Sequence, residues 1–519
     1  MNRRFLVSLV LAAGALLAAD SHVWKVAGPP PESWQRDRVA DLAAHRKAVM
    51  DQLGNKAILI LYAAEPRNYA GDVDWPYRQE NDFFYLTGIS QEGSKLVLIP
   101  GEDKIREILF MPPSNPAQEN WTGHILTPEE GRQISGIQEI WDARNFDSFL
   151  TTLIPQAKQA LGEQAHGQEG AKAPPLPVDV SQEFAKTIAA VADRSAELYM
   201  LGGTSPEYRR EAEFTSKLTA AYPGFTIKSP LEILDNLRAV KSAREIDLLK
   251  HADEITAEAF QRAYAVAVPG TPEYEIQAQF EFTFLRRNAH WGYPCIVASG
   301  LNATTLHYET NRDTMKAGDL LLMDDAAEFG GYSVDVTRTI PVSGKYNKEQ
   351  AEIYRLVWEG QRAGIQAAMP GKTTADVNVA AGSVIAEGLV KLGLMTDVNS
   401  KQQLRVWLNH GVSHGIGLNV HDPGRKEFQP GMAITMEPGI YIRPDALDNL
   451  PKTPENEKFI AAVKPAFEKY KGIGVRIEDD LLITTGKPEV LSAGIPSKLE
   501  DVEAAIAQSR KTLKTTPLP

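Results

Sequence analysis

The chain has almost no cysteine: Cys295 is the only one in 519 residues. A single cysteine excludes an internal disulfide, and none lies near the N-terminus to carry a lipid. Stability must therefore come from hydrophobic cores, which a chain of this length divides among about two or three domains.

Long apolar runs are absent beyond the N-terminus. There, Arg3 and Arg4 precede an apolar run, Phe5–Ala19, that ends in small residues. The run is shorter than the roughly 20 residues of a membrane-spanning helix. The pattern is typical of a cleaved secretory signal over residues 1–19, with a retained membrane anchor as the alternative. We expect a periplasmic or secreted protein without a stable membrane span, and the sequence does not distinguish these two locations.

Excess basic charge is absent as well. The chain has 55 Lys and Arg against 67 Asp and Glu, a net charge of -12, and it contains no dense Lys/Arg run. This balance opposes the phosphate neutralisation on which nucleic-acid binding relies, so we expect no nucleic-acid partner. The apolar content of 43% and the charged content of 24% are ordinary for a soluble globular protein.

Two domains are predicted after the signal. The first spans residues 32–229, follows a linker at Gly28–Pro31 and begins with a helix over Trp34–Gln52. Short apolar runs bounded by turn residues then predict the strands of an α/β domain. The clearest runs are Lys56–Tyr62, Lys95–Pro100 and Ile105–Met111.

The second domain is predicted over residues 230–510, with helices covering one face of an antiparallel sheet in an α+β arrangement. Its first helix contains a capping box of Ser242 and Glu245, and its last contains another of Ser497 and Glu500. The expected helices are Leu237–Ala252, Thr271–Arg287, Lys348–Met369, Thr374–Leu392 and Ser497–Arg510.

Two aspartates lie in the segment Asp319–Pro341, which predicts a hairpin that turns at Phe329–Gly331. If the arms pair symmetrically about Phe329 and Gly330, Asp324 lies opposite Asp335, with Cβ atoms about 5 Å apart. The two carboxylates would then be able to hold the same ions. A solvated acidic pair at the edge of a hairpin is the alternative.

Three of the ten histidines, His410, His414 and His421, lie together in NHGVSHGIGLNVHDPG. The glycines between them permit a close approach of the backbone to a ligand. For any single histidine a structural role is the ordinary interpretation, but the cluster favours function.

Glu437 and Glu478 interrupt apolar strands, AITMEPGIYI and GVRIEDDLLIT. A carboxylate in such a strand needs a cation, a hydrogen-bond network or a raised pKa. Together with Asp324, Asp335 and His414 they form a set of oxygen and nitrogen ligands that suits two divalent metals. Such a pair of metals can ionise a water, so the set indicates hydrolysis.

The ordered motifs resemble those of the pita-bread dinuclear metallopeptidases. They are LHY at Leu306–Tyr308, Asp324 and Asp335 followed by TRT, then SHGIGLNVHD, MEPGIYI and GVRIEDD. In the first domain, Tyr77–Gly88 (YRQENDFFYLTG) and Trp121–Gly123 resemble the Xaa-Pro aminopeptidase family, also called aminopeptidase P. The resemblance spans about residues 34 to 510. It implies an N-terminal α/β domain followed by a pita-bread catalytic domain, a curved antiparallel sheet covered by helices.

The resemblance also implies a ligand set for two divalent metal ions, usually manganese. Asp335 and Glu478 would bridge both ions, Asp324 would complete one site, and His414 with Glu437 would complete the other. A water between the ions would be the nucleophile, with its pKa lowered by the two cations, and Glu437 would accept and transfer its proton.

Four further residues match positions around the substrate in this family. His307 and His421 would stabilise the substrate carbonyl and the tetrahedral intermediate, where negative charge develops. His410 would lie beside the substrate pocket, and Arg476 would support the acidic site through charge-assisted hydrogen bonds.

The expected substrates are peptides with proline at the second position, cleaved before that proline. The bond is a tertiary amide without an N–H, so its pocket must accommodate a ring and forgo that contact. A prolidase restricted to Xaa-Pro dipeptides and a non-peptidase pita-bread protein are the alternatives. A homo-oligomer is also possible.

Two features depart from the family pattern. Asp325–Ala326 stands where the family commonly has Ala-Gly after the first ligand, and we expect Asp325 to point to the opposite face of its strand and be solvated rather than act as a sixth ligand. The segment Arg443–Lys471 is long for the family. We interpret it as an insertion that would shape the mouth of the pocket.

Overall fold

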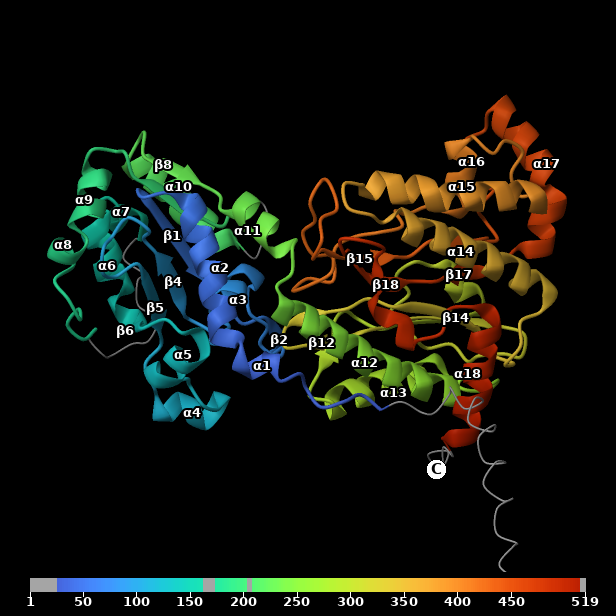
Figure 1. The fold of residues 1–519 in the computed structure, drawn as a ribbon, viewed down its shortest axis with the longest axis horizontal. Coiled ribbons are helices and arrows are strands. Elements are labelled where there is room, and N and C mark those ends of the chain that lie inside the picture. Colours follow the sequence, from blue (N-terminus) through green and yellow to red (C-terminus); the bar gives the residue numbers. More distant parts are fainter. Residues whose placement is uncertain (1–25, 162–172, 203–207, 514–519) are drawn as a thin grey trace, which may run out of the picture. The chain divides into compact units, whose positions relative to one another are not determined.

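The structure, a computed structural model, describes residues 26–161, 173–202 and 208–513 (Figure 1). It consists of two compact units. Pro31–Asp247 and Asp422–Arg425 form the first; Leu248–His421, residues 26–30 and the described residues from Lys426 onwards form the second. The expected signal over residues 1–19 lies outside the described residues. Within the described ranges, no helix is both long and apolar enough to cross a membrane.

The first unit is built on a six-stranded sheet of order β6-β5-β4-β1-β7-β8. β1 pairs antiparallel with β4 and β4 with β5, whereas β1–β7, β5–β6 and β7–β8 are parallel. The three strands predicted from apolar runs are confirmed, with slightly shorter limits. The strands are β1 (Ala57–Tyr62), β4 (Lys95–Leu98), β5 (Glu107–Met111), β6 (Glu139–Asp142), β7 (Glu197–Met200) and β8 (Thr226–Lys228), with a separate pair β2 (Asn68–Ala70) and β3 (Val73–Asp74).

Helices pack against this sheet around an aromatic core in which Phe110 contacts Trp141 and Phe149. The single helix expected over Trp34–Gln52 is interrupted at Asp37 and forms α1 (Ser33–Arg36) and α2 (Arg38–Leu53). The others are α3 (Asn81–Thr87), α4 (Pro116–Thr122), α5 (Pro128–Ser135), α6 (Phe146–Leu153), α7 (Ala157–Leu161), α8 (Val180–Glu183), α9 (Ala185–Ala192), α10 (Arg209–Ala221) and α11 (Leu231–Arg238).

The two units divide between Asp247 and Leu248, later in the chain than the expected domain limit at residue 230. The reason is that α11 packs on α2 and therefore belongs with the first unit. The limits 32–229 and 230–510 stay a prediction.

The second unit contains short strands that all pair antiparallel. In Figure 1, α12 and α13 lie on one side of these strands and α14 and α15 on the other. α13 packs on β9 and β10, whereas α14 packs on β15, β16 and β17, so each set of strands has its own covering helices. The helices are α12 (Ala243–Val266), α13 (Glu273–Arg286), α14 (Lys348–Ala367), α15 (Thr374–Leu392), α16 (Lys401–Trp407), α17 (Pro454–Tyr470) and α18 (Leu499–Thr512). The strands are β9 (His290–Trp291), β10 (Ile296–Ser299), β11 (Leu320–Asp324), β12 (Ala327–Phe329), β13 (Tyr332–Ser333), β14 (Thr337–Pro341), β15 (Ala433–Met436), β16 (Gly439–Tyr441), β17 (Gly474–Arg476), β18 (Asp479–Leu482) and β19 (Glu489–Val490).

One of the two predicted capping boxes is confirmed. The Ser242 N–H donates to Glu245 Oε2 at 2.7 Å, and the Glu245 N–H donates to Ser242 Oγ at 3.1 Å. The predicted capping box of Ser497 and Glu500 is wrong, because Lys498 is the N-cap of α18 and makes no side-chain hydrogen bond to the helix. Ser497 instead lies before the helix, where its carbonyl accepts from the Tyr354 hydroxyl at 2.7 Å.

The predicted hairpin forms, but its register differs by two residues. Gly330 and Gly331, with φ of 61° and 90°, make the turn, so Phe329 pairs with Tyr332 and Asp324 with Thr337. Asp324 is therefore not directly opposite Asp335. Two consecutive positive φ values are what a two-residue hairpin turn requires, and this moves the centre of symmetry onto the glycines. A shift of two residues keeps the same side chains on the same face.

Arg338 ties the hairpin to the strand that follows Glu478. Its fully buried guanidinium donates to the carbonyls of Glu478 and Ile495 and to Asp479 Oδ1, and its Nε donates to the Pro496 carbonyl at 2.9 Å. Both partners of the Arg338–Asp479 pair are almost inaccessible to solvent. The pair thus fixes the backbone around Glu478.

We predict that Arg338→Met destabilises the protein by about 3 to 5 kcal/mol, because it leaves the buried Asp479 carboxylate without its main partner. The measurement is urea-induced unfolding. The matched control is Arg355→Met on α14, where Arg355 and Glu500 are 53% and 54% exposed. It should cost less than about 1 kcal/mol. Equal effects of the two substitutions would contradict this role of Arg338.

Candidate metal centre

A cavity of about 350 Å³ in the second unit brings the predicted site residues together. All nine candidates line it, although they come from five separate segments of the chain. They are His307, Asp324, Asp335, His410, His414, His421, Glu437, Arg476 and Glu478.

Backbone hydrogen bonds between strand ends place the carboxylates. Asp324 is the last residue of β11, Glu437 lies between β15 and β16, and Glu478 lies between β17 and β18. The Glu478 N–H donates to the Thr337 carbonyl at 3.0 Å, and the Glu437 N–H donates to the Val412 carbonyl at 2.9 Å. Each carboxylate therefore projects from a backbone that neighbouring strands and loops hold in place.

The ligand atoms form two overlapping groups. Atoms of Asp324, Asp335 and Glu478 lie within 4.8 Å of one another, and so do atoms of His414, Glu437 and Glu478. His414 Nε2 lies 3.5 Å from Asp335 Oδ2 and 3.7 Å from Glu437 Oε1. Two groups that share Glu478 and consist of carboxylate oxygens and one imidazole nitrogen fit a pair of divalent cations.

The charges in this cavity also fit cations. Burial is the largest cause that raises the pKa values of Asp335 and Glu478 well above their ordinary range, and neighbouring carboxylates raise them further. For Glu437, burial followed by the charge of Glu478 raises the pKa to about 8. Carboxylates this close and this buried hold protons unless positive charge replaces them.

Arg476 is the cation that the protein itself contributes. Its buried guanidinium donates to Asp324 Oδ2, to the Tyr441 hydroxyl at 3.0 Å and, through Nε, to Thr337 Oγ1 at 2.9 Å. Thr337 Oγ1 in turn donates to Glu478 Oε2 at 2.7 Å. These contacts are charge-assisted and orient two of the ligand candidates.

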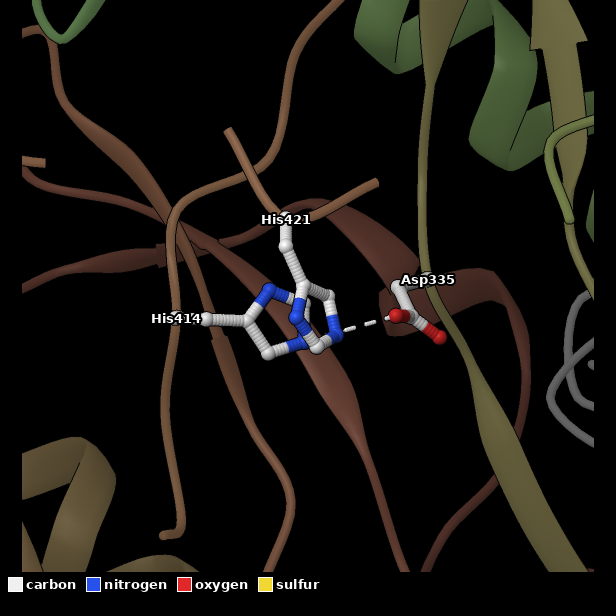
Figure 2. Close-up of side chains that lie close together, drawn as sticks. All are labelled: Asp335, His414 and His421. Atoms are coloured by element: carbon white, nitrogen blue, oxygen red, sulfur yellow. Dashed lines mark ion pairs between the residues drawn. The ribbon is translucent and has the colours of Figure 1, made fainter. Parts of the chain in front are cut away.

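The tautomer of His414 is set by its neighbour. His414 Nδ1 lies 3.0 Å from the Gly415 carbonyl, so Nδ1 carries a hydrogen and donates it there, and Nε2 faces the carboxylates. Figure 2 shows the His421 ring beside the His414 ring, with Asp335 next to both. The two ring centres lie 3.9 Å apart, and these three residues form a further compact group of ligand atoms.

His410 and His421 are neutral at neutral pH. Burial, and then the charge of Arg476, lowers the pKa of His410 to about 4, and its Nε2 lies 2.9 Å from the Tyr441 hydroxyl. Burial, and then His414, lowers the pKa of His421 to about 4. The neutral His410 ring donates its one N–H, on Nδ1, to the Gly411 carbonyl at 2.7 Å, and neither imidazole adds charge to the cavity. His307 also lines the cavity and is exposed.

Tyr293 is a site residue that the sequence analysis did not identify. Its hydroxyl lies 2.7 Å from Oδ1 of Asp324 and 2.7 Å from Oδ1 of Asp335. The hydroxyl therefore lies between the two aspartates and offers its one hydrogen to this pair of carboxylates. The only signal in the sequence was its place shortly before the apolar strand β10, which many structural tyrosines share.

The two departures from the family pattern behave differently from expectation. Asp325 is 1% exposed, so the expectation that it is solvated was wrong. It lies near Cys295, and burial raises its pKa well above the ordinary range, which favours a neutral carboxyl. None of the compact ligand groups found among the described residues includes it.

The segment Arg443–Lys471 does not shape the cavity in this structure. Its main element is α17, which packs through Phe467 on Trp407, with ring centres 6.2 Å apart, and through the Tyr470 hydroxyl on Glu352 at 2.5 Å. None of its residues is among those that line the described cavity.

Comparison with known proteins decides the family. Family models described as "Metallopeptidase family M24" and "Aminopeptidase P, N-terminal domain" match residues 247–485 and 42–161. The chain is 31% identical to the Xaa-Pro aminopeptidase of Haemophilus influenzae, over 88% of this chain and 95% of that protein. The chain belongs to the Xaa-Pro aminopeptidase family.

Other members of the Xaa-Pro aminopeptidase family agree with this assignment. The Escherichia coli Xaa-Pro aminopeptidase is 31% identical over 90% of this chain and 97% of its own. The structure of Pseudomonas aeruginosa aminopeptidase PepP superposes with a TM-score of 0.74 at 31% identity, covering 91% of this chain and 98% of that one. Escherichia coli aminopeptidase P with the inhibitor Pro-Leu gives 0.75 at 29% identity, covering 91% and 99%. These matches confirm the predicted α/β domain and pita-bread catalytic domain, and they make the chain a metallopeptidase.

We predict that the metal-free protein loses stability as the pH rises from about 6.5 to 8. The pKa of Glu437 is about 8 in the folded chain against 4.5 ordinarily, so in this window the folded state holds a proton that the unfolded state has lost. Unfolding free energy then falls with pH by up to about 1.4 kcal/mol per pH unit for each such proton. Below pH 6.5 the lowered pKa values of His410 and His421 act in the opposite direction.

Urea unfolding of EDTA-treated protein at several pH values measures this slope. Glu437→Gln should reduce it, because the amide does not titrate. A slope that is unchanged in the variant would contradict the raised pKa of Glu437.

Proposed function

We propose that this protein is an exported, two-metal aminopeptidase that hydrolyses the N-terminal Xaa-Pro bond of peptides. The observation that carries the proposal is the convergence of four carboxylates and His414 Nε2 on one cavity of the pita-bread unit. Export is supported by the N-terminal sequence, and manganese by the ligand set, since carboxylates and one imidazole suit a hard or borderline ion.

In this proposal Asp335 and Glu478 would hold both ions, Asp324 would complete one site, and His414 with Glu437 would complete the other. Glu478 supports the bridging role because it belongs to both ligand groups, and Asp335 because it contacts Asp324 and His414 alike. When bound, the ions supply Lewis acidity to the scissile carbonyl and lower the pKa of the attacking water.

The side chains of this protein then perform the proton transfers and stabilise charge. Glu437 accepts a proton from the water and delivers it to the departing proline nitrogen; its high pKa in the metal-free state marks it as a basic carboxylate. His421 and His307 donate N–H groups to the oxygen on which negative charge develops. Arg476 holds Asp324 in place through its guanidinium, and His410 lines the substrate side of the cavity.

The preference for proline is supported by the relatives. Those with 31% identity are named Xaa-Pro aminopeptidases, and a similar structure holds the inhibitor Pro-Leu. A prolidase that cleaves only dipeptides uses the same chemistry, so substrate length is the property that separates the two activities.

We predict that the metal-reconstituted protein hydrolyses Xaa-Pro-Yaa tripeptides and that a chelator abolishes the activity. Matched Xaa-Ala-Yaa peptides should react much more slowly, because their second residue does not fill a pocket made for a ring. Release of the first amino acid by chromatography is the measurement. Turnover restricted to Xaa-Pro dipeptides would replace the proposal by a prolidase.

We predict that Glu437→Ala lowers kcat by about 10²- to 10⁴-fold, the usual contribution of a positioned acid or base. Metal content must be measured beside the rate, since Glu437 is also a proposed ligand. Glu359→Ala on α14 is the matched control, because Glu359 is exposed and does not line the cavity. Substantial activity in Glu437→Ala with its full metal content would reject the proton-transfer role.

A further inference from the structure

Glu309 differs from every other acidic residue of the cavity. It lines the cavity together with His307 and the ligand candidates, but it is exposed, whereas Asp324, Asp335 and Glu478 are buried. Among the described residues no hydrogen bond or ion pair of its carboxylate is found, and the one cation that lines the cavity, Arg476, is buried and engaged with Asp324. Glu309 is therefore an available negative charge at the surface of the cavity.

The backbone that carries Glu309 is fixed on both sides. The Tyr308 hydroxyl donates to Glu273 Oε2 at 3.0 Å, and the Asp313 N–H donates to the same oxygen at 2.9 Å. The Asn311 side chain accepts from the Val297 N–H at 3.0 Å and donates to the Cys295 carbonyl at 2.8 Å. Glu309 thus stands on a segment anchored to α13 and β10, and its charge is presented at a defined place.

The anchoring residue Glu273 is completely buried, and it holds both this segment and the neighbouring residues Ser299 and Asn302. Its Oε1 accepts from the N–H and the hydroxyl of Ser299, each at 2.7 Å, and from the Asn302 side chain at 3.1 Å. Glu273 therefore explains why the segment is ordered, but Glu309 contributes nothing to that order. A free carboxylate that adds no stability and faces a substrate cavity is available for recognition.

No other described residue that lines the cavity presents an exposed negative charge to a substrate side chain. Its apolar lining includes Pro294, Ile296, Leu306 and Val420, and its remaining carboxylates are those assigned to the ions. A positive side chain that approaches Glu309 gains a favourable ion pair, and a negative one is repelled. Every substrate of an aminopeptidase carries an N-terminal ammonium, so selectivity must come from an additional charge.

We propose that Glu309 makes this enzyme select peptides that carry a basic side chain next to the proline, at the first or the third residue. This inference rests on the proposed function and adds a substrate class to it. The expected kcat/KM for a peptide with a basic side chain is about threefold higher than for the matched neutral peptide, which is the effect that one exposed ion pair has on an equilibrium. The difference should be mainly a lower KM rather than a higher kcat. It should also weaken with salt, since screening between exposed charges is strong at about 0.5 M.

The test compares peptides that differ only in charge. Lys-Pro-Ala is paired with norleucine-Pro-Ala, and Ala-Pro-Lys with Ala-Pro-norleucine, so that chain length stays constant while the ammonium is removed. The quantity measured is the ratio of kcat/KM within each pair, at 0.05 M and 0.5 M salt. Wild type should favour the lysine peptide in at least one pair, and the preference should shrink at high salt.

Variants at Glu309 then assign the preference to this residue. Glu309→Gln should bring that ratio close to one, and Glu309→Lys should invert it. Glu387→Gln is the control: it removes one negative charge from an exposed position of α15 that does not line the cavity, and it should leave the ratio unchanged. Circular dichroism and metal content should match wild type in all three variants.

The outcomes separate the two proposals. Hydrolysis of all four peptides with no lysine preference, or a preference that survives in Glu309→Gln, overturns the role of Glu309 and leaves the proposed function intact. No hydrolysis of any Xaa-Pro-Yaa peptide by the metal-reconstituted wild type overturns the proposed function itself.

Discussion

The rest of this structure depends on one constraint, the unfavourable free energy of burying several carboxylates in one cavity. Asp335 and Glu478 lie deep in the second unit with their oxygens close to those of Asp324. In water each would be ionised at neutral pH, but inside the protein the charged form loses its hydration and meets other negative charges. Arg476 offsets part of this cost through Asp324, and the Tyr293 hydroxyl lies between the two aspartates. What is still missing is positive charge, and divalent cations supply it.

The pita-bread unit serves to hold that arrangement before cations arrive. The ligands lie far apart in sequence. The antiparallel pairing of β11 with β14 and of β15 with β18, together with the hydrogen bond from the Glu478 N–H to the Thr337 carbonyl, brings them together. Arg338, a buried residue of β14, links the hairpin to the backbone of Glu478 and to Asp479. Mutual repulsion of the carboxylates is thus opposed by a rigid frame, which is what a site with defined geometry requires.

Much of the site followed from the sequence because its residues break local patterns. Glu437 and Glu478 interrupt apolar strands, and a buried acid in such a place demands a partner. The capping box of Ser242 and Glu245 formed because both hydrogen bonds are local. The fold of the catalytic domain and the substrate class came from motif resemblance, since spacing alone does not specify either.

Other features depended on tertiary contacts that no local pattern records. The hairpin register follows from two glycines with positive φ, and the sequence alone left their exact place in the turn open. α18 begins one residue later than the sequence pattern predicts, with Lys498 as its N-cap, while the Ser497 carbonyl accepts from Tyr354 of a helix distant in sequence. Asp325 is buried near Cys295 rather than solvated because the strand has protein on both faces.

Anomalous X-ray scattering from crystals grown with manganese tests the central claim most directly, since it locates the ions without any assay of activity. The account predicts two peaks, one near Asp324 and one near His414 and Glu437, with Asp335 and Glu478 in contact with both. A single peak, or peaks away from these five side chains, would contradict it.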